Sequence, residues 1–553
     1  MIKLNLNFLI KKLNMKPLLP IVFLFLMTHP VFAQTFDSLS MNNIGANILA
    51  GGKVFGSEDG GKDGIYYPLS ENIKNNTVYA GGYWLGGVDM GGLLHVAAQT
   101  YNQSGFDYWT GPVATNYDAD YDNRYNRVWS ITRQEINNHT LNYNSEGYIM
   151  PEVIANWPVH GNVANGEPYY LAPFTDVNND GVYHPDQGDY PIINGDKAVY
   201  FIINDARLPH TETGGNPFGI DIYSMVYAYN APDIPFLHNS IFLNTRIVNR
   251  SEQTYNMLFG MWMDFDMGNL YNDATGCDTL LNMYYGYNRD TISEEMMENG
   301  LPAQGCMMLN HHLNSCLVSK NDFSVQGNPN TPDEYYRYLN GLWKNGAPLT
   351  YGGNGMGGDI ATHYMFSGNP LSGEGWTMLN ADPPFSPPTD LRVQGSINPF
   401  SLSPNEQICI DMAFPAAQAP SGTPMPHIAA VAQLKEYAQE IQDWYDTSFG
   451  NCAIDLLATG VHDFTANQPE MQVHIRYDMA SQNVVFDISS PYQEQVNLQL
   501  INMEGKIAQN YQAVLQKGSN TLSFSFTGLP QGMYIASVSS TRNSWRGKII
   551  VPF

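Results

Sequence analysis

Basic residues are scarce in this sequence. Its 553 residues include 26 Lys and Arg against 52 Asp and Glu, which gives a formal net charge of −26 at pH 7. Nucleic acids and anionic membranes bind proteins through a basic face that displaces counterions. The sequence therefore predicts that neither of them is a partner of this protein.

Cysteine is also rare. An odd number of cysteines allows at most two disulfides and one free thiol, and their spacing matches no zinc-binding motif. The sequence does not determine which of them pair. The five residues are Cys277, Cys306, Cys316, Cys409 and Cys452.

Long apolar runs are missing, apart from a short one, Leu18 to Met27, near the N-terminus. Four lysines precede it and the small-residue site Val31-Phe32-Ala33 follows it, which is typical of a secretory signal. A membrane anchor would need about 20 apolar residues. We therefore predict a signal peptide over residues 1–33, cleaved between Ala33 and Gln34, and no transmembrane helix in the mature chain.

Signatures of common enzymes are absent as well. The sequence has no G-x-S-x-G elbow, no H-E-x-x-H helix and no glycine-rich phosphate loop. His210-Thr211-Glu212 offers a base beside an acid, but nothing supplies a nucleophile. A glycoside hydrolase needs only two carboxylates, and the sequence does not single these out among its many acids. Enzymatic activity thus stays undecided, and the absence of signatures favours a non-catalytic role.

Aromatic and turn-forming residues are abundant, with 35 Tyr, 25 Phe, 9 Trp, 50 Gly and 34 Pro. Short β-type segments between Gly, Pro and Asn clusters predict a mostly β, sandwich-like fold. Residues 79–88 and 93–98 are expected to form one hairpin, and residues 240–249 and 255–264 another. Apolar residues three and four apart over 427–445 predict one amphipathic helix docked on a sheet.

Charge is unevenly distributed along the chain. Residues 34–464 hold 16 basic and 47 acidic residues, whereas residues 465–553 hold six and five. Such a shift indicates a domain boundary. We predict an acidic β-rich passenger over residues 34–450, in one or two subdomains, a linker over 451–464, and an immunoglobulin-like β-sandwich of about seven strands over 465–553.

One acidic loop resembles a calcium site. In residues 176–182, DVNNDGV, oxygen donors stand at positions 1, 3 and 5 and Gly181 at position 6, as in the first half of a calcium loop. Position 12 is Gln187, so the closing carboxylate must be another acid, and Asp189 is favoured over Asp186. The alternative is an Asx-rich turn without metal. The predicted calcium ligands are Asp176, Asn178, Asp180, the Val182 carbonyl and Asp189.

A second, weaker cluster of acids follows a predicted strand. It comprises Asp264, Asp266, Asn269, Asp273 and Asp278. Acids this dense repel one another unless a cation or water separates them. A solvated acidic loop is the favoured interpretation, and a second cation site is the alternative.

The C-terminal residues resemble a known family. A Glu-Gly-Lys turn (504–506), the run Leu529 to Tyr534 and a basic then β-branched strand (546–551) are similar to the type A sorting domain of Bacteroidetes type IX secretion cargo. The usual Pro-Asn-Pro start is replaced by Asn-Gln-Pro at 467–469. The resemblance implies contact with the secretion machinery, passage through the periplasm, and release or attachment to surface lipopolysaccharide.

The passenger resembles a group of large uncharacterised secreted proteins, for which no activity is known. The motifs are YWLGG (83–87), VAAQTY (96–101), NWP (156–158), DVNNDGVYHPDQGDYP (176–191), HTETGG (210–215) and GCD (276–278). We therefore expect a calcium-stabilised, secreted or surface-displayed β protein with a structural, adhesive or ligand-binding role. Its Tyr and Trp suit stacking on an extracellular glycan, although such residues more often pack in a core. The alternative is a secreted polysaccharide hydrolase that uses paired carboxylates.

Overall fold

The protein is described by a computed structural model. Buried apolar side chains form two separate cores, one drawn from residues 39–454 and the other from 484–538. The passenger core is one continuous cluster, and the second core belongs to the predicted C-terminal domain. The structure describes residues 36–57, 64–69, 74–101, 105–291, 301–385, 389–420, 422–449, 452–454, 459–460, 472–478, 483–490, 493–502, 507–525, 528–530, 532–539 and 544–551.

The passenger is built on two large antiparallel sheets, and 42% of the described residues are in strands against 14% in helices. The first sheet has the order β1 (Phe36–Ser40), β2 (Gly45–Leu49), β3 (Lys53–Phe55), β5 (Lys74–Asp89), β14 (Tyr255–Phe265), β19 (Leu391–Ile397) and β18 (Leu313–Lys320), with β4 (Ile65–Leu69), β6 (Leu94–Ala98) and β20 (Phe400–Leu402) paired to its members. The second has the order β15 (Asp273–Asp278), β16 (Met283–Asn288), β17 (Pro302–Met308), β21 (Gln407–Gln418), β13 (Ser240–Asn249), β12 (Ile220–Ala228), β11 (Lys197–Asn204) and β7 (Trp109–Thr110), with β8 (Trp129–Thr132) paired to β11.

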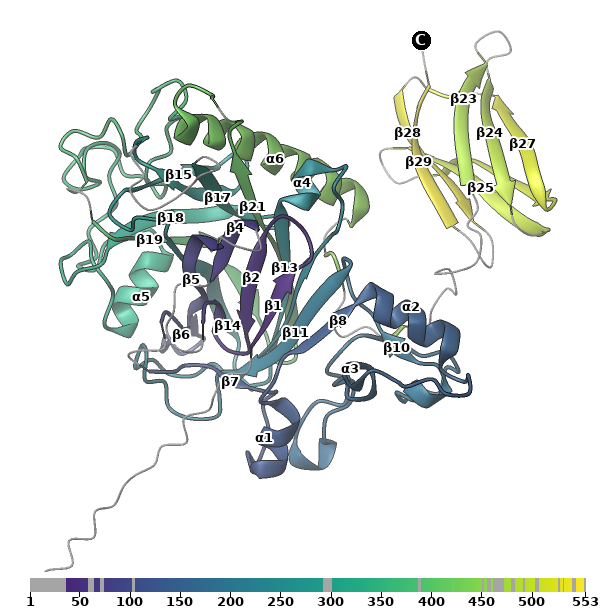
Figure 1. Ribbon diagram of the computed structural model, residues 1–553, viewed down its shortest axis with the longest axis horizontal. Coiled ribbons are helices and arrows are strands. Elements are labelled where there is room, and N and C mark those ends of the chain that lie inside the picture. Colours follow the sequence, from purple (N-terminus) through teal and green to yellow (C-terminus); the bar gives the residue numbers. More distant parts are fainter. Residues whose placement is uncertain are drawn as a thin grey trace, which may run out of the picture.

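The two sheets pack face to face (Figure 1). Tyr83 on β5 reaches across the core, and its hydroxyl lies 2.9 Å from Ser224 Oγ on β12 and 2.7 Å from Thr245 Oγ1 on β13. The ring of Phe55 meets that of Phe414 edge to face at 4.8 Å. A polar hydroxyl is tolerated there because it has partners. The mostly β, sandwich-like fold predicted from the sequence is confirmed.

The two predicted hairpins have different outcomes. β5 and β6 pair as expected, and Gly92 in their turn has a φ of 83°. The second hairpin is wrong, because β13 lies in the second sheet and β14 in the first. Every residue of β13 is buried, and ten of the eleven in β14 are too. Strands buried on both faces are central strands with two neighbours each, so the turn at 250–254 carries the chain between sheets instead of folding it back.

The predicted amphipathic helix is present as α6 (Pro426–Ser448), which contacts β21 and β17 of the second sheet. Figure 1 shows it lying across one face of the passenger. Val431, Leu434, Ala438 and Ile441 are fully buried on its inner side. The other helices of the described chain are short: α1 (Ala119–Tyr125), α2 (Arg133–Asn142), α3 (Glu152–Ala155), α4 (Pro235–His238), α5 (Pro332–Leu339) and the 3-10 turns η1 (Val163–Asn165) and η2 (Pro185–Gln187).

The segment predicted as a linker, 451–464, is in part attached to the passenger. Cys452 forms a disulfide with Cys409 of β21. Further along, β22 (Thr459–Gly460) pairs in parallel with β9 (Phe174–Thr175), which also pairs with β10 (Tyr190–Pro191). The linker prediction is therefore corrected for these residues, because backbone hydrogen bonds and a covalent bond hold them.

The C-terminal domain has the seven strands that the sequence predicts. One sheet has the order β23 (Gln472–Asp478), β24 (Asn483–Ser490) and β27 (Gly518–Ser525); the other has β26 (Ile507–Leu515), β25 (Glu494–Asn502), β28 (Gly532–Ser539) and β29 (Ser544–Val551). The predicted signal peptide and its cleavage site at Ala33 and Gln34 lie outside the described residues. Within the described part of the chain, no helix is long and apolar enough to cross a membrane.

Candidate functional site

The predicted calcium loop lies between β9 and β10. Its polar side chains bind its own backbone: Asp176 Oδ2 accepts from Gly181 N at 2.7 Å, Asn178 Oδ1 from Asp180 N at 3.0 Å, and Asp180 Oδ1 from Val182 N at 2.8 Å. Gly181 has a φ of 79°, the left-handed conformation that position 6 requires. The loop is thus a tight turn closed by Asx-type hydrogen bonds between its own side chains and backbone.

The closing residue, Asp189, is fully buried. Its two oxygens accept from Val177 N at 2.8 Å and His184 N at 2.7 Å. Burial raises the pKa of Asp189; these backbone bonds oppose the rise, and Asp176 and Asp180 add to it. In this conformation the three carboxylates do not all converge within 4.8 Å of one another. The loop therefore carries the predicted ligands close together along the chain, but their three carboxylates do not meet at a single metal position.

The second predicted cluster is divided by the fold. Asp264, Asp266 and Asp273 lie where β14 ends and β15 begins, and each is at least 94% buried. Asp278, at the far end of β15, instead forms an ion pair of 2.8 Å with Lys435 of α6. The remaining member, Asn269, accepts the backbone N–H of Tyr271 in an exposed turn. The prediction of one solvated acidic loop is corrected, because its main acids are buried.

An arginine from a distant strand forms an ion pair with one of these acids, Asp264. Arg392 on β19 lies 2.8 Å from Asp264 Oδ1 and also binds both oxygens of Asp390. Tyr101 donates to Asp264 Oδ2 at 2.6 Å, and its ring lies 5.2 Å from the Arg392 guanidinium carbon. This partner is not among the residues predicted from the sequence. Only the pairing of β14 with β19, which puts Met263 opposite Val393, brings the two charges together.

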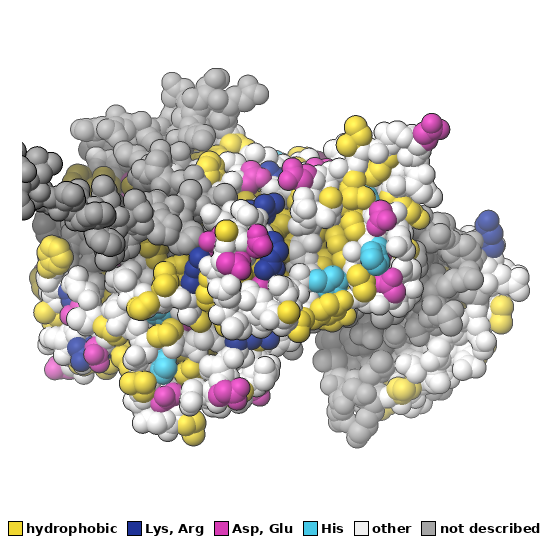
Figure 2. Space-filling model, turned by 90° about the horizontal axis from the view of Figure 1, so that it is seen from below, with side chains coloured by type: hydrophobic (Ala, Val, Ile, Leu, Met, Phe, Trp, Pro, Cys, Tyr) yellow, Lys and Arg dark blue, Asp and Glu magenta, His cyan; other side chains and the backbone are white. Residues whose placement is uncertain are grey.

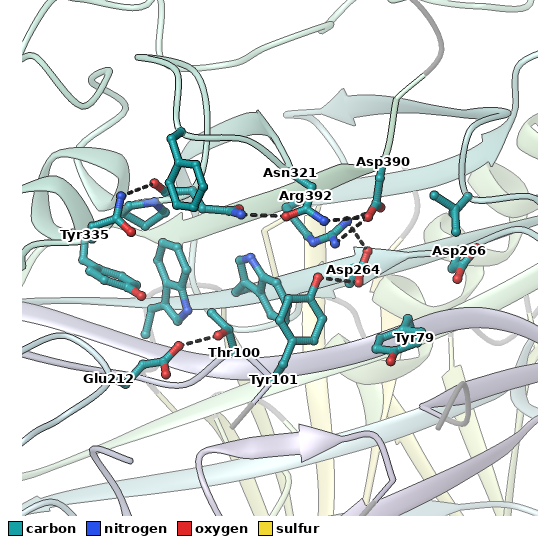
Figure 3. A pocket seen from close by; sticks show the side chains of 17 residues that line it. Tyr79, Thr100, Tyr101, Glu212, Asp264, Asp266, Asn321, Tyr335, Asp390 and Arg392 are labelled. Atoms are coloured by element: carbon teal, nitrogen blue, oxygen red, sulfur yellow. Dashed lines mark hydrogen bonds and ion pairs between the residues drawn. The ribbon is translucent and has the colours of Figure 1, made fainter. Parts of the chain in front are cut away.

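These residues line a cavity of about 490 Å³, the size of a small-molecule site. Figure 3 shows its polar and aromatic side chains converging from both sides. They come from β5, β14, β19 and α5 and from the loops next to β6, β11, β14, β18 and β19. The lining residues are Tyr79, Trp84, Thr100, Tyr101, Glu212, Trp262, Asp264, Asp266, Leu270, Asn321, Phe323, Asn328, Pro329, Asn330, Tyr335, Asp390 and Arg392. We refer to this cavity as the cleft.

A row of aromatic rings lines the cleft. Neighbouring centroids lie 5.7 Å apart for Tyr79 and Tyr101, 5.0 Å for Tyr101 and Trp262, 6.4 Å for Trp262 and Trp84, and 4.7 Å for Trp84 and Tyr335. The two tryptophans and Tyr335 are buried, whereas Tyr79 and Tyr101 are partly exposed. The side chain of Phe323 is different, because it is 86% exposed. The aromatic surface that the cleft exposes therefore comes mainly from Tyr79, Tyr101 and Phe323.

Glu212 is the most unusual acid of the cleft. It is 8% exposed; Oε1 accepts from Thr100 Oγ1, and Oε2 has no hydrogen-bond partner among the described residues. Burial raises the pKa of Glu212 to about 7. Burial also raises the pKa of Asp264 to about 7, although Arg392 acts in the opposite direction. Burial, followed by the charge of Glu212, raises the pKa of Tyr335.

His210 does not act with Glu212. Its Nδ1 lies 2.7 Å from the carbonyl oxygen of Val96, and its Nε2 lies 2.8 Å from that of Asp205. Both nitrogens are thus engaged with the backbone. The ring fixes the loop between β11 and β12, which carries Glu212 into the cleft.

Most surface arginines near α1 are neutralised locally. On the face drawn in Figure 2, Lys and Arg gather mainly in one central group with Asp and Glu beside them. Around α1, Arg124 pairs with Glu167 at 2.7 Å and Arg207 with Asp122 at 2.6 Å. Such pairs hold loops in place and leave little net positive field.

A secretion system C-terminal sorting domain matches residues 480–552, within the seven-stranded C-terminal domain. The C-terminal domain is a type IX secretion sorting domain. The protein is exported to the cell surface or the extracellular space, and this domain is the part that contacts the secretion machinery. This match does not extend into the passenger, whose resemblance to uncharacterised secreted proteins stays a prediction.

No curated protein matches the chain. Among solved structures, a polysaccharide lyase aligns with 60% of this chain and 34% of its own, at 7% identity and a TM-score of 0.19. The BSP domain of a biofilm-associated protein aligns with 64% of this chain and 60% of its own, at 10% identity and a TM-score of 0.13. The chain thus spans about a third of the lyase. Similarities this weak carry no functional argument.

Proposed function

We propose that the passenger is an exported, non-catalytic protein that binds an extracellular carbohydrate in the cleft. The observation that carries this proposal is the combination of partly exposed aromatic rings with carboxylates in one cavity. Sugar rings present C–H faces that pack on aromatic side chains and hydroxyls that bond to ionised groups. A cavity lined by aromatic surface with a few oriented polar groups is the usual form of a small-molecule site.

The polar groups of the cleft are held in fixed positions, which favours binding of a rigid ligand. Asn321 donates to Asp390 Oδ2 at 2.9 Å, and Arg392 is fixed by Asp264 and Asp390. Because these side chains are already ordered, little further rotamer entropy is lost when a ligand binds. Pre-organisation of this kind suits recognition at a surface where ligand is dilute.

The experiment compares two exposed apolar residues. Phe323, 86% exposed, lines the cleft; Leu280, 93% exposed, does not. Glycans that bind the wild type on an array are titrated by calorimetry into Phe323→Ala and Leu280→Ala. We expect Phe323→Ala to weaken binding about tenfold, or ~1.4 kcal/mol, and Leu280→Ala to have no effect. Equal affinities of both variants, or an array without any bound glycan, would contradict the proposal.

A second candidate function is hydrolysis of the bound glycan. It is favoured by the pKa of about 7 at Glu212, since a buried acid that is protonated near neutrality suits a general acid. Against it, two of the three other acids of the cleft, Asp264 and Asp390, are bound to Arg392, so neither is a free second carboxylate. Incubation of the protein with bound glycans tests this: new reducing ends that disappear in Glu212→Gln would establish hydrolysis.

Calcium in the loop from Asp176 to Asp189 is also a proposal. It is supported by the left-handed Gly181 and by the raised pKa of the buried Asp189, since a cation would stabilise its ionised form. Asp176, Asn178, Asp180, the Val182 carbonyl and Asp189 would hold the ion after a small closure of the loop. A ligand bound only by the folded state adds about 2.7 kcal/mol at a hundredfold excess over Kd. Thermal melts in calcium and in chelator should therefore differ by several degrees, and equal melting temperatures would refute calcium.

The final location of the passenger is part of the same proposal. We expect the exported protein to be released or attached to surface lipopolysaccharide after removal of residues 465–553. Cell fractionation with an antibody against the passenger distinguishes the two. Passenger found only in the periplasm would contradict both.

A further inference from the structure

The cleft carries a strong excess of negative groups. Its lining includes four acids, Glu212, Asp264, Asp266 and Asp390, and a single basic residue, Arg392. Counted as formal charges, the lining carries four negative charges and one positive charge. An anionic sugar, such as a uronate or a sulfated sugar, would face this potential with only one cation to receive it.

Arg392 has little capacity to receive an anion. The residue is 3% exposed, and both terminal nitrogens of its guanidinium bind carboxylates while the group packs over Tyr101, so only the buried Nε has no partner among the described residues. An anionic ligand at the terminal nitrogens would have to displace one of these carboxylates. Displacement would leave a buried charge without its partner, which is costly.

The cleft already shows how it accommodates a cation. The Arg392 guanidinium lies between the carboxylates of Asp264 and Asp390 and the face of Tyr101. Carboxylates and an aromatic face together stabilise a desolvated cation. A cationic group of a ligand bound in the cleft would be stabilised by the same two kinds of side chain.

Glu212 provides the same elements at another position in the cleft. Its Oε2 is buried without a hydrogen-bond partner among the described residues. Trp84 and Tyr335, whose rings are 4.7 Å apart, line the same cavity, and Figure 3 shows Glu212 on the side where Tyr335 lies. A buried acceptor without a donor is unfavourable. A ligand that brings a charged donor would satisfy it.

We propose that the cleft selects a sugar that carries a protonated amino group, which Glu212 receives beside Trp84 and Tyr335. This inference rests on the proposed carbohydrate-binding function and specifies its ligand class. The amine donates to Glu212, the sugar ring packs on the aromatic surface, and the remaining acids disfavour anionic sugars.

The test uses the full exported chain and four tetrasaccharides in calorimetry at pH 7 and low salt, where a sugar amine is still largely protonated. They are a glucosamine tetramer, its N-acetylated form, a neutral glucose tetramer and a galacturonate tetramer. We expect the glucosamine tetramer to bind at least about tenfold more tightly than the other three. Added salt should weaken that binding most, because screening acts on charge.

Two variants then locate the preference. Glu212→Gln should reduce the preference for the glucosamine tetramer to about threefold or less, whereas Glu252→Gln, an exposed acid in the turn between β13 and β14, should leave it unchanged. Neutral or anionic tetramers that bind wild type as well as glucosamine would overturn the amine inference while sustaining carbohydrate binding. Failure of all four tetramers, together with an array without bound glycans, would overturn the proposed function itself. The wild-type series decides the inference even if Glu212→Gln does not fold.

Discussion

Glu212 should make the stability of the passenger depend on pH near neutrality. Burial raises its pKa from the ordinary value of 4.5 to about 7. The folded state therefore holds a proton between these pH values that the unfolded state has lost. Protein stability falls with pH wherever the folded state binds more protons. The contribution of Glu212 is thus fully present below about pH 4.5, and it is lost as pH rises through 7.

The magnitude follows from the same two pKa values. Each pKa unit corresponds to about 1.4 kcal/mol, so the change from 4.5 to about 7 corresponds to roughly 3 kcal/mol in the free energy of unfolding. Glu212→Gln removes the titration while keeping the size of the side chain and an oxygen for Thr100 to donate to. Relative to wild type, this variant should gain up to about 3 kcal/mol in stability between pH 4.5 and pH 8.

The assay is urea denaturation of wild type and variant at half-unit steps from pH 4.5 to 8.5, followed by tryptophan fluorescence. The quantity to compare at each pH is the difference in free energy of unfolding between wild type and variant, because the other buried acids titrate in both proteins and cancel. Glu252→Gln is the matched control, since Glu252 is exposed, and its difference from wild type should stay flat. A flat difference for Glu212→Gln as well would refute the burial argument.

Three further predictions concern other parts of the chain. Asp176→Ala and Asp180→Ala should each abolish the calcium-dependent rise in melting temperature without preventing folding, and a rise that persists in both variants would exclude this loop as the site. Replacing Cys409 and Cys452 together by Ala should lower the free energy of unfolding by about 4 kcal/mol, because their disulfide spans 43 residues; urea melts that coincide with wild type would contradict this. A chain that ends after Gly460 keeps the passenger core and β22, so it should fold and accumulate in the periplasm, and its normal appearance in the medium would show that residues 465–553 are not needed for export.

The fold was predictable wherever a local pattern determines it. The helix at 427–445 and the hairpin of β5 and β6 follow from periodicity and from a turn rich in glycine. The pairing partners of β13 and β14, which lie in different sheets, were not predictable in this way. Both strands are buried along almost their whole length, so they lack the alternation that marks a hairpin with one solvated face. A short polar turn between two such strands fits a hairpin and a crossing between sheets equally well.

The sorting domain was the most predictable functional part, because its motifs are local and ordered along the chain. Its turn, its Leu529 to Tyr534 run and its last strand are enough to indicate the family. The calcium loop was predictable from the sequence only in part. The sharp turn expected at Gly181 is present, but a side chain that binds backbone N–H groups and one that binds a metal have the same sequence pattern, so the calcium site stays a prediction.

The cleft could not be predicted from the sequence, and the reason is physical. Asp264 and its neighbours look like a solvated or metal-binding loop because the cation that compensates them, Arg392, comes from a distant strand. Glu212 looks like the partner of His210 because the two are close in sequence, yet the fold turns His210 to the backbone and Glu212 to the cavity. Charge compensation between strands depends on sheet register, and register here is set by buried strands without a distinctive pattern. The one available signal was the density of acids after β14, which shows that a cation is required there but not which one.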